Sequence, residues 1–461
     1  MKLKDIQSVY FIGIGGIGMS AIARWFNQRG VKVGGYDRVD TNLTTRLSLE
    51  GMWVHYEDNP RNIPAEFMDK EKTLIIYTPA VPKKHEELRY FQKKKFIVMK
   101  RSEALGIISK KHYTVAVGGT HGKTTTSSMV AHLLNQSEKG CSAFIGGIMT
   151  NYDSNLIVGG EDAPVVVEAD EFDRSFLWLS PNYTVVTSVD PDHLDIYGDE
   201  EQMKDAFGEF VKLSGEDGST LIHHAAAEKI NMHLENLYYT YGIDKGDIQA
   251  KALRAVNGMF VFNYHGNEVI KDLTLSVPGF HNVENAVAAV RVALDLGMDP
   301  ETIKAGIASY RGVKRRFEYI IKDEKLTFID DYAHHPTEIT AFLKSVKALF
   351  PRKKLTVIFQ PHLFSRTRDF QTGFAESLSL ADEIILLDIY PAREEPIPGI
   401  TSQIIFDNIT KEQKILCEKS ELMEVIATRN VELLCTVGAG NIDQEVPKLK
   451  SYYLKKYQIE S

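Results

Sequence analysis

Short runs of consecutive apolar residues alternate with amphipathic stretches along most of the chain. Such runs are typical of strands buried on both faces of a parallel sheet, and the stretches between them have helical spacing. The runs that we interpret as strands are residues 9–13, 31–36, 74–78, 114–117, 164–168, 183–189, 326–330, 355–359, 383–388 and 431–437. The pattern therefore predicts an α/β protein.

Helical spacing follows several of these runs. One expected helix ends near Gln28, and another begins at Thr124. A third begins in the segment 278–289 and runs to about Leu296, and others lie near 337–349, 368–379 and 421–428. Residues 255–277 differ, because apolar and polar positions alternate there, and they predict antiparallel hairpins. A glycine turn at residues 438–441 follows the last strand and leads into another helix.

The strands and helices fall into three blocks. The second block starts near Ile108, and the third follows the basic stretch 314–317, which we expect to be exposed. A chain of 461 residues is too long for one hydrophobic core, so about two to four domains are expected.

Residues 113–126, Tyr-Thr-Val-Ala-Val-Gly-Gly-Thr-His-Gly-Lys-Thr-Thr-Thr, have the layout of a phosphate-binding loop between a strand and a helix. Backbone N–H groups freed by the glycines surround phosphate oxygens, and the helix N-terminus favours the negative charge. Lys123 would contact the β- and γ-phosphates, and the hydroxyl of Thr124 or Thr125 would bind Mg²⁺. Valine replaces the first glycine of the strict pattern at residue 117, so the loop is a shortened variant. The alternative interpretation, a glycine turn followed by a solvated lysine, explains fewer of these residues than a phosphate-binding loop does.

A second glycine turn lies near the N-terminus. Gly13, Gly15 and Gly18 form a G-x-G-x-x-G pattern between a strand and a helix, and Asp37 ends the next strand, where a carboxylate can bind a ribose hydroxyl. Alone, this pattern also fits an NAD-dependent oxidoreductase. The turn recognises a diphosphate, however, and a UDP-sugar offers the same group.

Acidic residues follow two strands of the second block. Glu168, Asp170, Glu171 and Asp173 follow one strand, and 190–195, Asp-Pro-Asp-His-Leu-Asp, follows the next. Glu168 is a candidate Mg²⁺ ligand, because four nearby acids repel one another unless a cation or an arginine compensates. His193 is a candidate ligand of a second ion. A solvated acidic loop and a structural histidine are the alternatives.

The third block ends two strands in loops rich in histidine and arginine, residues 329–338 and 359–368. An arginine beside histidines suits a small carboxylate, because guanidinium binds carboxylate through two hydrogen bonds. The two loops therefore predict a binding site, although each residue alone could be a surface polar group.

The net charge of −8 and the pI near 6.0 argue against nucleic-acid binding. Cys141, Cys417 and Cys435 are too far apart for a metal motif and fit a reducing compartment. No signal peptide or membrane span is evident, so we expect a cytoplasmic protein without a membrane partner. Nucleophile-elbow and zinc-hydrolase motifs are missing from the sequence.

Taken together, these motifs resemble the Mur ligase family over nearly the whole chain and in the same order. The segments that carry the resemblance are 13–20, 119–125, 168–171, 192–195, His281-Asn282 with Asn285, 315–317, 331–337, and 360–362 with 365–367.

The resemblance implies three α/β domains: an N-terminal Rossmann-like domain for a UDP-sugar at 1–107, a central P-loop ATPase-type domain at 108–313, and a C-terminal Rossmann-like domain at 314–461. It is closest to members that use ATP and two Mg²⁺ ions to join L-alanine to UDP-N-acetylmuramate through an acyl phosphate. That reaction belongs to peptidoglycan biosynthesis, and hence to cell wall biogenesis, cell shape and cell division. A monomer or homodimer is expected.

The resemblance also implies roles for individual residues. The expected ATP contacts are Gly119, Thr120, His121, Gly122, Lys123, Thr124, Thr125, Asn282, Asn285, Arg316 and Asp331. The expected UDP-sugar contacts are Gly15, Gly16, Gly18, Met19, Ser20, Asp37, Thr78, Arg101 and His121. The alanine pocket would contain Tyr332, His334, His362 and Arg366. Lys123, Glu168 and His193 would be catalytic, and Thr124, Glu168 and His193 would bind metal.

Two positions depart from relatives of this kind. No clear equivalent of a carbamylated lysine follows Asp195, and Leu363 stands where many alanine-adding relatives have a basic residue. Three alternatives stay open: an NAD-dependent oxidoreductase, a P-loop switch that hydrolyses nucleotide, and a murein tripeptide-recycling ligase. The N-terminal glycine motif of the recycling ligase differs from residues 13–20.

Overall fold

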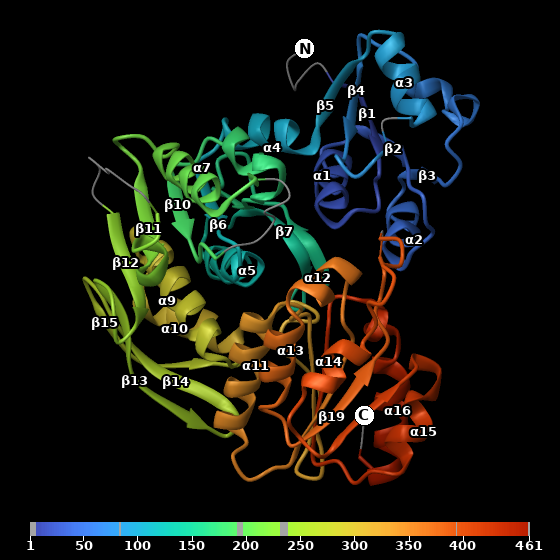
Figure 1. The fold of residues 1–461 in the computed structure, drawn as a ribbon. Helices are drawn as coiled ribbons and strands as arrows, with labels where there is room; N and C mark the ends of the chain where they lie inside the picture. The colour runs from blue at the N-terminus through green and yellow to red at the C-terminus, as the bar shows by residue number, and fades with distance from the viewer. Residues whose placement is uncertain (1–5, 83, 191–196, 231–237, 393, 460–461) are drawn as a thin grey trace. The chain divides into compact units, whose positions relative to one another are not determined.

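The computed structural model of the chain describes residues 6–82, 84–190, 197–230, 238–392 and 394–459. Its strands form three separate sheets with helices packed on them (Figure 1). Among the helices in these ranges, none is both long enough and apolar enough to span a bilayer.

The N-terminal sheet is entirely parallel and has the order β3-β2-β1-β4-β5. Its strands are β1 Ser8–Ile12, β2 Lys32–Tyr36, β3 Trp53–His55, β4 Thr73–Tyr77 and β5 Ile97–Lys100. Its helices are α1 Ile17–Asn27, α2 Asn42–Leu49, α3 Glu86–Lys93 and α4 Arg101–Ser109, with 3-10 turns η2 Pro60–Asn62 and η3 Ala65–Phe67. The strand order reverses between β1 and β4. Ligands of open parallel sheets bind at such a reversal, and the first glycine turn follows β1 there.

The central sheet has the order β15-β14-β13-β12-β11-β10-β6-β9-β7-β8. Its strands are β6 Thr114–Gly118, β7 Ser142–Met149, β8 Ser154–Ile157, β9 Val165–Glu168, β10 Tyr183–Val186, β11 Ser219–His223, β12 Tyr238–Ile243, β13 Ile248–Val256, β14 Met259–His265 and β15 Val269–Leu275. The associated helices are α5 Lys123–Leu134, η4 Phe172–Trp178, α7 Glu200–Lys212, α8 His224–Ala227, α9 Phe280–Asp295 and α10 Pro300–Ser309. Strand β6, which leads into the phosphate loop, is flanked by β9 and β10, both parallel to it.

The C-terminal sheet has the order β16-β17-β21-β18-β19-β20, and only the β16–β17 pair is antiparallel. Its strands are β16 Glu318–Lys322, β17 Thr327–Asp331, β18 Leu355–Phe359, β19 Glu383–Leu387, β20 Lys414–Cys417 and β21 Leu433–Val437. Its helices are α11 Pro336–Leu349, α12 Phe364–Asp369, α13 Gln371–Leu378, α14 Gln403–Asn408, α15 Leu422–Ala427 and α16 Val446–Tyr457, with η5 Lys419–Glu421 and η6 Asn441–Gln444.

The predicted α/β class is confirmed, and each predicted strand has a counterpart in the structure. Three details of the prediction were wrong. The strand predicted at 183–189 ends at Val186, and the helix predicted at 368–379 is two helices that meet at Phe370. The stretch at 314–317 is not exposed throughout, because the Phe317 side chain is only 1% exposed and packs on the ring of Phe342, with ring centroids 5.1 Å apart.

One hydrophobic core connects the first sheet to the central sheet. Helix α1 packs against β7 and β8 as well as on its own sheet. Trp25 of α1 and Phe144 of β7 belong to the same buried cluster, and their ring centroids are 6.4 Å apart. The C-terminal sheet has a core of its own, which includes Phe328, Ile358 and Leu434.

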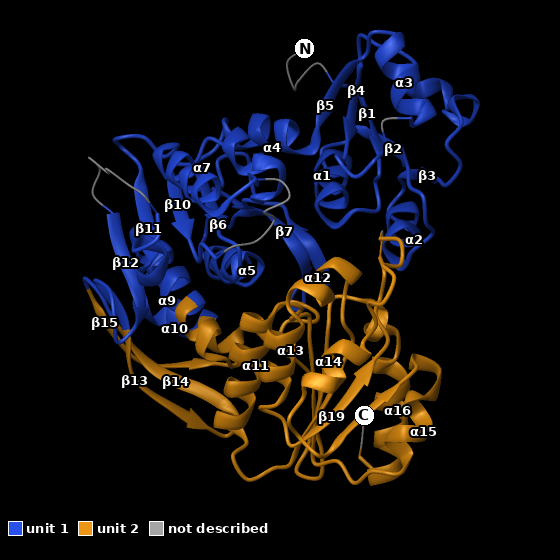
Figure 2. Ribbon diagram, in the orientation of Figure 1, with its two compact units in different colours: residues 1–249, 265–267, 285–306 blue, residues 250–264, 268–284, 307–461 orange. Residues whose placement is uncertain are grey.

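The chain divides into two compact units (Figure 2). The first comprises residues 1–249, 265–267 and 285–306, and the second comprises residues 250–264, 268–284 and 307–461. The division passes through strand β13 and helix α9. The first unit therefore contains the N-terminal sheet together with the phosphate loop.

A buried glycine tests the packing of the N-terminal sheet. A Cβ atom at Gly35 would lie against the carbonyl oxygen of Phe11 on the neighbouring strand, closer than real side chains come. We expect Gly35→Ala to destabilise the fold by about 1–3 kcal/mol, as overpacking does. Urea denaturation followed by circular dichroism measures the change. Gly160→Ala is the control, because open space surrounds that position, and an equal loss in both variants would contradict the packing argument.

Candidate active site

The phosphate loop is formed where β6 ends at Gly118 and α5 begins at Lys123. Gly119 has φ +141° and Gly122 has φ +82°, conformations that residues with side chains rarely adopt. A Cβ atom at Gly119 would also collide with the hydroxyl of Thr187. Glycine is therefore required at Gly119 by both the backbone conformation and the space.

Residues after β10 hold this loop in place. The Thr187 hydroxyl donates to the carbonyl oxygens of Gly118, at 3.1 Å, and His121, at 2.5 Å. The Ser188 hydroxyl accepts a hydrogen bond from the His121 N–H at 2.7 Å, and the Thr120 N–H donates to the Ser188 carbonyl at 3.1 Å. Two residues that directly follow β10 thus fix the conformation of the loop.

Glu168, at the end of β9, faces the start of α5. The Thr124 hydroxyl donates to Glu168 Oε1 at 2.9 Å, and the Gly146 N–H donates to Oε2 at 2.7 Å. Hydroxyl and carboxylate oxygens are the ligands that Mg²⁺ prefers, with phosphate oxygens and water completing its shell. This pair of residues therefore fits a magnesium ion beside the phosphate loop.

The other three acids of the cluster are paired with cations of the protein. Glu171 lies 2.6 Å from the Lys123 ammonium. Asp170 pairs with Arg101 at 2.7 Å, and Asp173 pairs with Lys100 at 2.8 Å. Protein side chains therefore provide much of the charge compensation that the sequence led us to expect from a metal. The expected metal role of Glu168 depends on its position opposite Thr124.

His193 and the neighbouring Asp192 and Asp195 lie outside the described residues. Asp190, the last described residue before them, lies 2.5 Å from the Lys229 ammonium and 3.8 Å from His121 Nε2. His121 is half-buried.

The residues expected to bind the UDP-sugar surround the first glycine turn. Asp37 accepts a hydrogen bond from the Gly15 N–H at 2.7 Å, and a Cβ atom at Gly13 would collide with Thr78. A Cβ atom at Gly18 would collide with the guanidinium of Arg101. Gly16 is exposed, whereas Met19 and Ser20 are buried in α1. The structure thus brings Asp37, Thr78 and Arg101 to one turn.

A cavity of about 160 Å³ lies between this turn and the acidic cluster. Its polar wall contains Gly18, Arg101, Glu168 and Asp170. The remaining lining residues are Ile17, Ala21, Ile22, Leu105, Phe144, Ile145 and Gly146. The cavity extends from the glycine turn to the carboxylate that faces Thr124.

The two asparagines expected to contact ATP lie in the first turns of α9. Asn285 accepts a hydrogen bond from the Thr126 hydroxyl at 2.9 Å, so it lies beside the helix that follows the phosphate loop. Asn282, in the second unit, donates to the carbonyl of Pro278 at 3.0 Å. Both side chains are buried.

In the second unit, Arg316 and Asp331 lie at one end of β17. The Asp331 carboxylate accepts hydrogen bonds from the N–H groups of Phe317, at 2.7 Å, and Ala333, at 2.8 Å. Burial raises the pKa of Asp331 to about 6, although Arg316 acts in the opposite direction. The Arg316 guanidinium lies 5.0 Å from the centre of the Tyr332 ring.

Three of the residues expected to bind alanine form a chain of ring contacts. The ring centroids of Tyr332 and His334 are 5.3 Å apart, and those of His334 and His362 are 6.1 Å apart. Burial lowers the pKa of His334 to about 4, and the positive charge of Arg366 acts in the same direction. His334 is therefore neutral near pH 7, and Arg366 lies close enough to influence it.

Arg366 is carried by the short helix α12, which starts after an unusual residue. Leu363 has φ +70°, a conformation that costs a residue with a side chain about 1–3 kcal/mol. Its N–H donates to the carbonyl of Tyr390 at 3.0 Å. The ring of Tyr390 stacks on His362, with centroids 6.0 Å apart. The surrounding contacts thus hold a strained backbone between His362 and Arg366.

Sequence reasoning missed several residues near these groups. Glu338 accepts a hydrogen bond from the His334 N–H at 3.0 Å, and its spacing after His335 is that of a helix capping box, which the sequence does contain. Glu394 accepts a hydrogen bond from the Ser365 N–H at 3.0 Å. No sequence signal identifies Glu394 or Tyr390.

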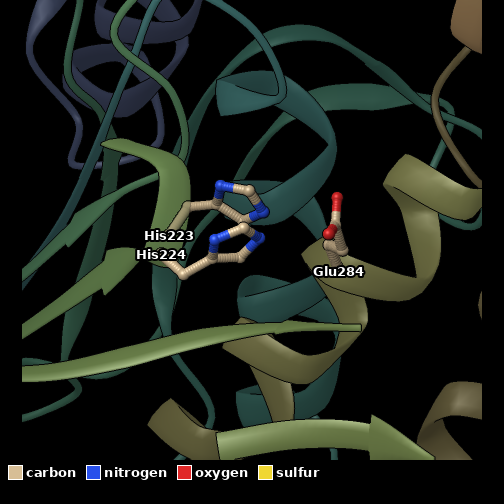
Figure 3. A group of neighbouring side chains, drawn as sticks. All are labelled: His223, His224 and Glu284. Atoms are coloured by element: carbon tan, nitrogen blue, oxygen red, sulfur yellow. The ribbon is translucent and has the colours of Figure 1, made fainter. Parts of the chain in front are cut away.

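Two further histidines were not singled out either. His223 ends β11 and His224 begins α8, and their ring centroids are 4.6 Å apart (Figure 3). Glu284, which is labelled with them, belongs to helix α9 and to the second unit.

Comparison with known proteins defines the class. Residues 8–113 match the Mur ligase family catalytic domain, 117–293 the Mur ligase middle domain, and 315–439 the Mur ligase glutamate ligase domain. The chain belongs to the Mur ligase family.

Among its relatives are proteins named UDP-N-acetylmuramate–L-alanine ligase. The one from Parabacteroides distasonis is 49% identical over 458 residues, covering 99% of each chain. The one from Phocaeicola vulgatus is 47% identical over 460 residues, covering 99% of this chain and 100% of the relative.

Solved structures agree with this family. The UDP-N-acetylmuramate-alanine ligase of Thermotoga maritima has a TM-score of 0.82 and 30% identity, covering 97% of this chain and 99% of that chain. A murein peptide ligase of Psychrobacter arcticus has a TM-score of 0.68 and 21% identity over 96% of this chain and 98% of its own, which shows a shared fold.

The buried carboxyl of Asp330 gives a pH prediction. Burial raises its pKa from the usual 3.8 to about 7, although Arg315 and the Thr436 hydroxyl act in the opposite direction. The folded protein therefore keeps a proton that the unfolded chain loses, so this group's contribution to stability falls as the pH rises from about 4 to 8.

We expect Asp330→Asn to remove that fall, because the amide keeps the shape without the charge. The free energy of unfolding of the variant, relative to that of the wild type, should rise by about 2–4 kcal/mol when the pH is raised from 5 to 8. Urea denaturation of both proteins at the two pH values measures this gain. Asp407→Asn, at an exposed position of α14, is the control. A wild-type-to-variant difference independent of pH would contradict the argument.

Proposed function

We propose that this protein is an ATP-dependent ligase that joins L-alanine to the carboxylate of UDP-N-acetylmuramate through an acyl phosphate, a step of peptidoglycan biosynthesis. The products are UDP-N-acetylmuramoyl-L-alanine, ADP and phosphate. The observation that carries this proposal is the cavity whose wall contains Gly18 of the glycine turn, Arg101 and Glu168, the carboxylate that faces Thr124 at the start of α5. Relatives with this name match over the full chain at 45–49% identity.

The phosphate loop binds the triphosphate of ATP. Its N–H groups and the N-terminus of α5 face the phosphates, and Lys123 neutralises charge on the γ-phosphoryl group during transfer. A carboxylate reacts poorly with an amine until one of its oxygens becomes a phosphate leaving group. The loop therefore provides the activation that amide formation requires.

Thr124 and Glu168 would hold a Mg²⁺ ion, whose positive charge would offset the negative charge on the phosphates. Their oxygen atoms already lie within hydrogen-bond distance of each other. His193, which lies outside the described residues, would hold a second ion. The catalytic group of the central domain consists of Lys123, Glu168 and His193.

The N-terminal domain, residues 1–107, binds the UDP-sugar. The helix that begins after Gly16 directs its N-terminus at the diphosphate, together with Gly15, Gly18, Met19 and Ser20. Arg101, beside Gly18, attracts the negative charge of the substrate, and Asp37, Thr78 and His121 complete the contacts. The muramate carboxylate then enters the cavity toward Glu168.

The C-terminal domain, residues 314–461, binds the amino acid. Arg366 pairs with the carboxylate of L-alanine, and the rings of Tyr332, His334 and His362 enclose its small side chain. The remaining ATP contacts come from Asn285 and Asn282 of α9, and from Arg316 and Asp331. The central domain covers residues 108–313.

The protein functions as a monomer or homodimer in the cytoplasm, where its nucleotide substrates are found. A recycling ligase for tripeptides is the nearest alternative, and the murein peptide ligase of Psychrobacter arcticus shares only 21% identity with this chain. An NAD-dependent oxidoreductase leaves the Lys123 loop and Glu168 without a role.

Phosphate release from ATP tests the function directly. We expect release only when UDP-N-acetylmuramate, L-alanine and Mg²⁺ are all present, and Lys123→Ala should reduce it by about 100-fold or more because the transition-state charge is no longer neutralised. Lys139→Ala, an exposed lysine beyond α5, is the control. Release without the sugar or the amino acid would indicate a nucleotide-hydrolysing switch, and use of a tripeptide in place of L-alanine would indicate the recycling ligase.

Loss of Arg366 tests the alanine pocket. Arg366→Ala should raise the KM for L-alanine by about 10- to 100-fold, as expected when a carboxylate loses its guanidinium partner, and leave the KM for ATP nearly unchanged. Steady-state kinetics with alanine varied gives both values. Arg368→Ala is the control on the same helix, because Arg368 is half exposed and pairs with Asp369 at 2.7 Å. An unchanged alanine requirement would show that the pocket lies elsewhere.

A further inference from the structure

The ammonium of Lys123 is fully engaged within the protein. It lies 2.6 Å from Glu171, and it donates to the carbonyl oxygens of Gly119, at 2.6 Å, and Thr120, at 3.4 Å. Backbone carbonyls thus accept hydrogen bonds from this ammonium, and Glu171 Oε2 is the counter-ion beside it. A phosphate that reaches Lys123 must compete with these partners.

Glu171 is the partner that carries charge. Its side chain is 3% exposed, and that of Lys123 is 14% exposed, so water screens the pair poorly. A poorly solvated ammonium is costly without an anion nearby, so Lys123 needs a counter-ion beside it when the loop is empty.

The backbone around Glu171 is held firmly. The Tyr197 hydroxyl donates to the Glu171 carbonyl at 2.6 Å, and the Arg174 N–H donates to the same oxygen at 3.0 Å. Asp173 and Arg174 both have positive φ values, 55° and 51°. Such backbone strain persists only where the surroundings impose it. The backbone that carries the Glu171 side chain is thus held beside the phosphate loop, whereas its carboxylate contacts Lys123.

We propose that Glu171 is a positioning residue that occupies Lys123 in place of the nucleotide phosphates and is displaced from it when ATP binds. The proposal deepens the proposed function, on whose phosphate loop it rests. Glu171 keeps the empty loop charge-balanced and folded. The same carboxylate competes with the triphosphate for the ammonium and so weakens ATP binding.

Removing the charge of Glu171 separates this competition from a merely structural role. In Glu171→Gln the side chain keeps its shape and a carbonyl acceptor, but it no longer rivals a phosphate for the ammonium. We expect Mg²⁺–ATP to bind about tenfold tighter, which corresponds to losing one charged partner. The KM for ATP should fall accordingly, with a smaller change in kcat. Titration calorimetry with a non-hydrolysable ATP analogue measures the affinity.

A graded variant keeps the test decisive if Glu171→Gln folds poorly. Glu171→Asp withdraws the carboxylate by one methylene, so ATP should bind about threefold tighter than to the wild type. Asp173→Asn is the matched control, since this acid of the same segment pairs with Lys100, and its ATP affinity should equal that of the wild type.

The outcomes distinguish failure of the proposed competition at Lys123 from failure of the proposed function. Unchanged or weaker ATP binding in both Glu171 variants would overturn the competition, because a structural role predicts loss of affinity. Equal tightening in Asp173→Asn would also overturn it, since the effect would then be one of overall charge. Absence of ATP binding to the wild-type protein would instead contradict the proposed function.

Discussion

The arrangement of the phosphate site depends on the pairing of β6 with its two neighbours. Val117 of β6 is in register with Glu168 of β9, and Gly118 is in register with Val186 of β10. Because the three strands are parallel, their carboxyl ends lie at one edge, where the loop, Glu168 and Thr187 meet. A shift by a single residue would turn Glu168 to the opposite face of the sheet. The hydrophobic side chains that bury β6 and β9 therefore also determine where the carboxylate faces Thr124.

A second constraint is electrostatic and follows from the first. Four acids at the end of β9 lie close together, and the protein supplies Lys123, Lys100 and Arg101 against three of them. Two of these cations come from the end of β5 and the start of α4 in the N-terminal sheet. That sheet shares a hydrophobic core with the central sheet through α1, so these ion pairs form within one compact unit. The charges that would repel one another thus help to join the first glycine turn to the phosphate loop.

Much of this could be predicted from the sequence, because buried strands and glycine loops are local signals. The phosphate loop, the glycine turn and the order of strands and helices follow from such signals. The short strands β3 and β5 were missed because their apolar runs are only three or four residues long and their side chains are at most partly buried. The pairing of Glu171 with Lys123 was also out of reach, since it depends on strand register. The burial of Phe317 could not be predicted either. Its neighbours in sequence are basic, and its packing partner, Phe342, is distant in sequence. His193 stays a prediction.

The glycine turn shows why one motif cannot define the substrate. Asp37 lies at the spacing expected for a ribose contact, yet in this structure it accepts a hydrogen bond from Gly15. That bond shapes the turn and is compatible with any diphosphate. What distinguishes this chain is that the cavity beside the turn has Glu168 in its wall, and Glu168 also accepts a hydrogen bond from the first threonine of α5. Binding of a nicotinamide cofactor does not require a second phosphate-binding loop beside the glycine turn. A sugar acid that must be phosphorylated does require such a loop close to its carboxylate.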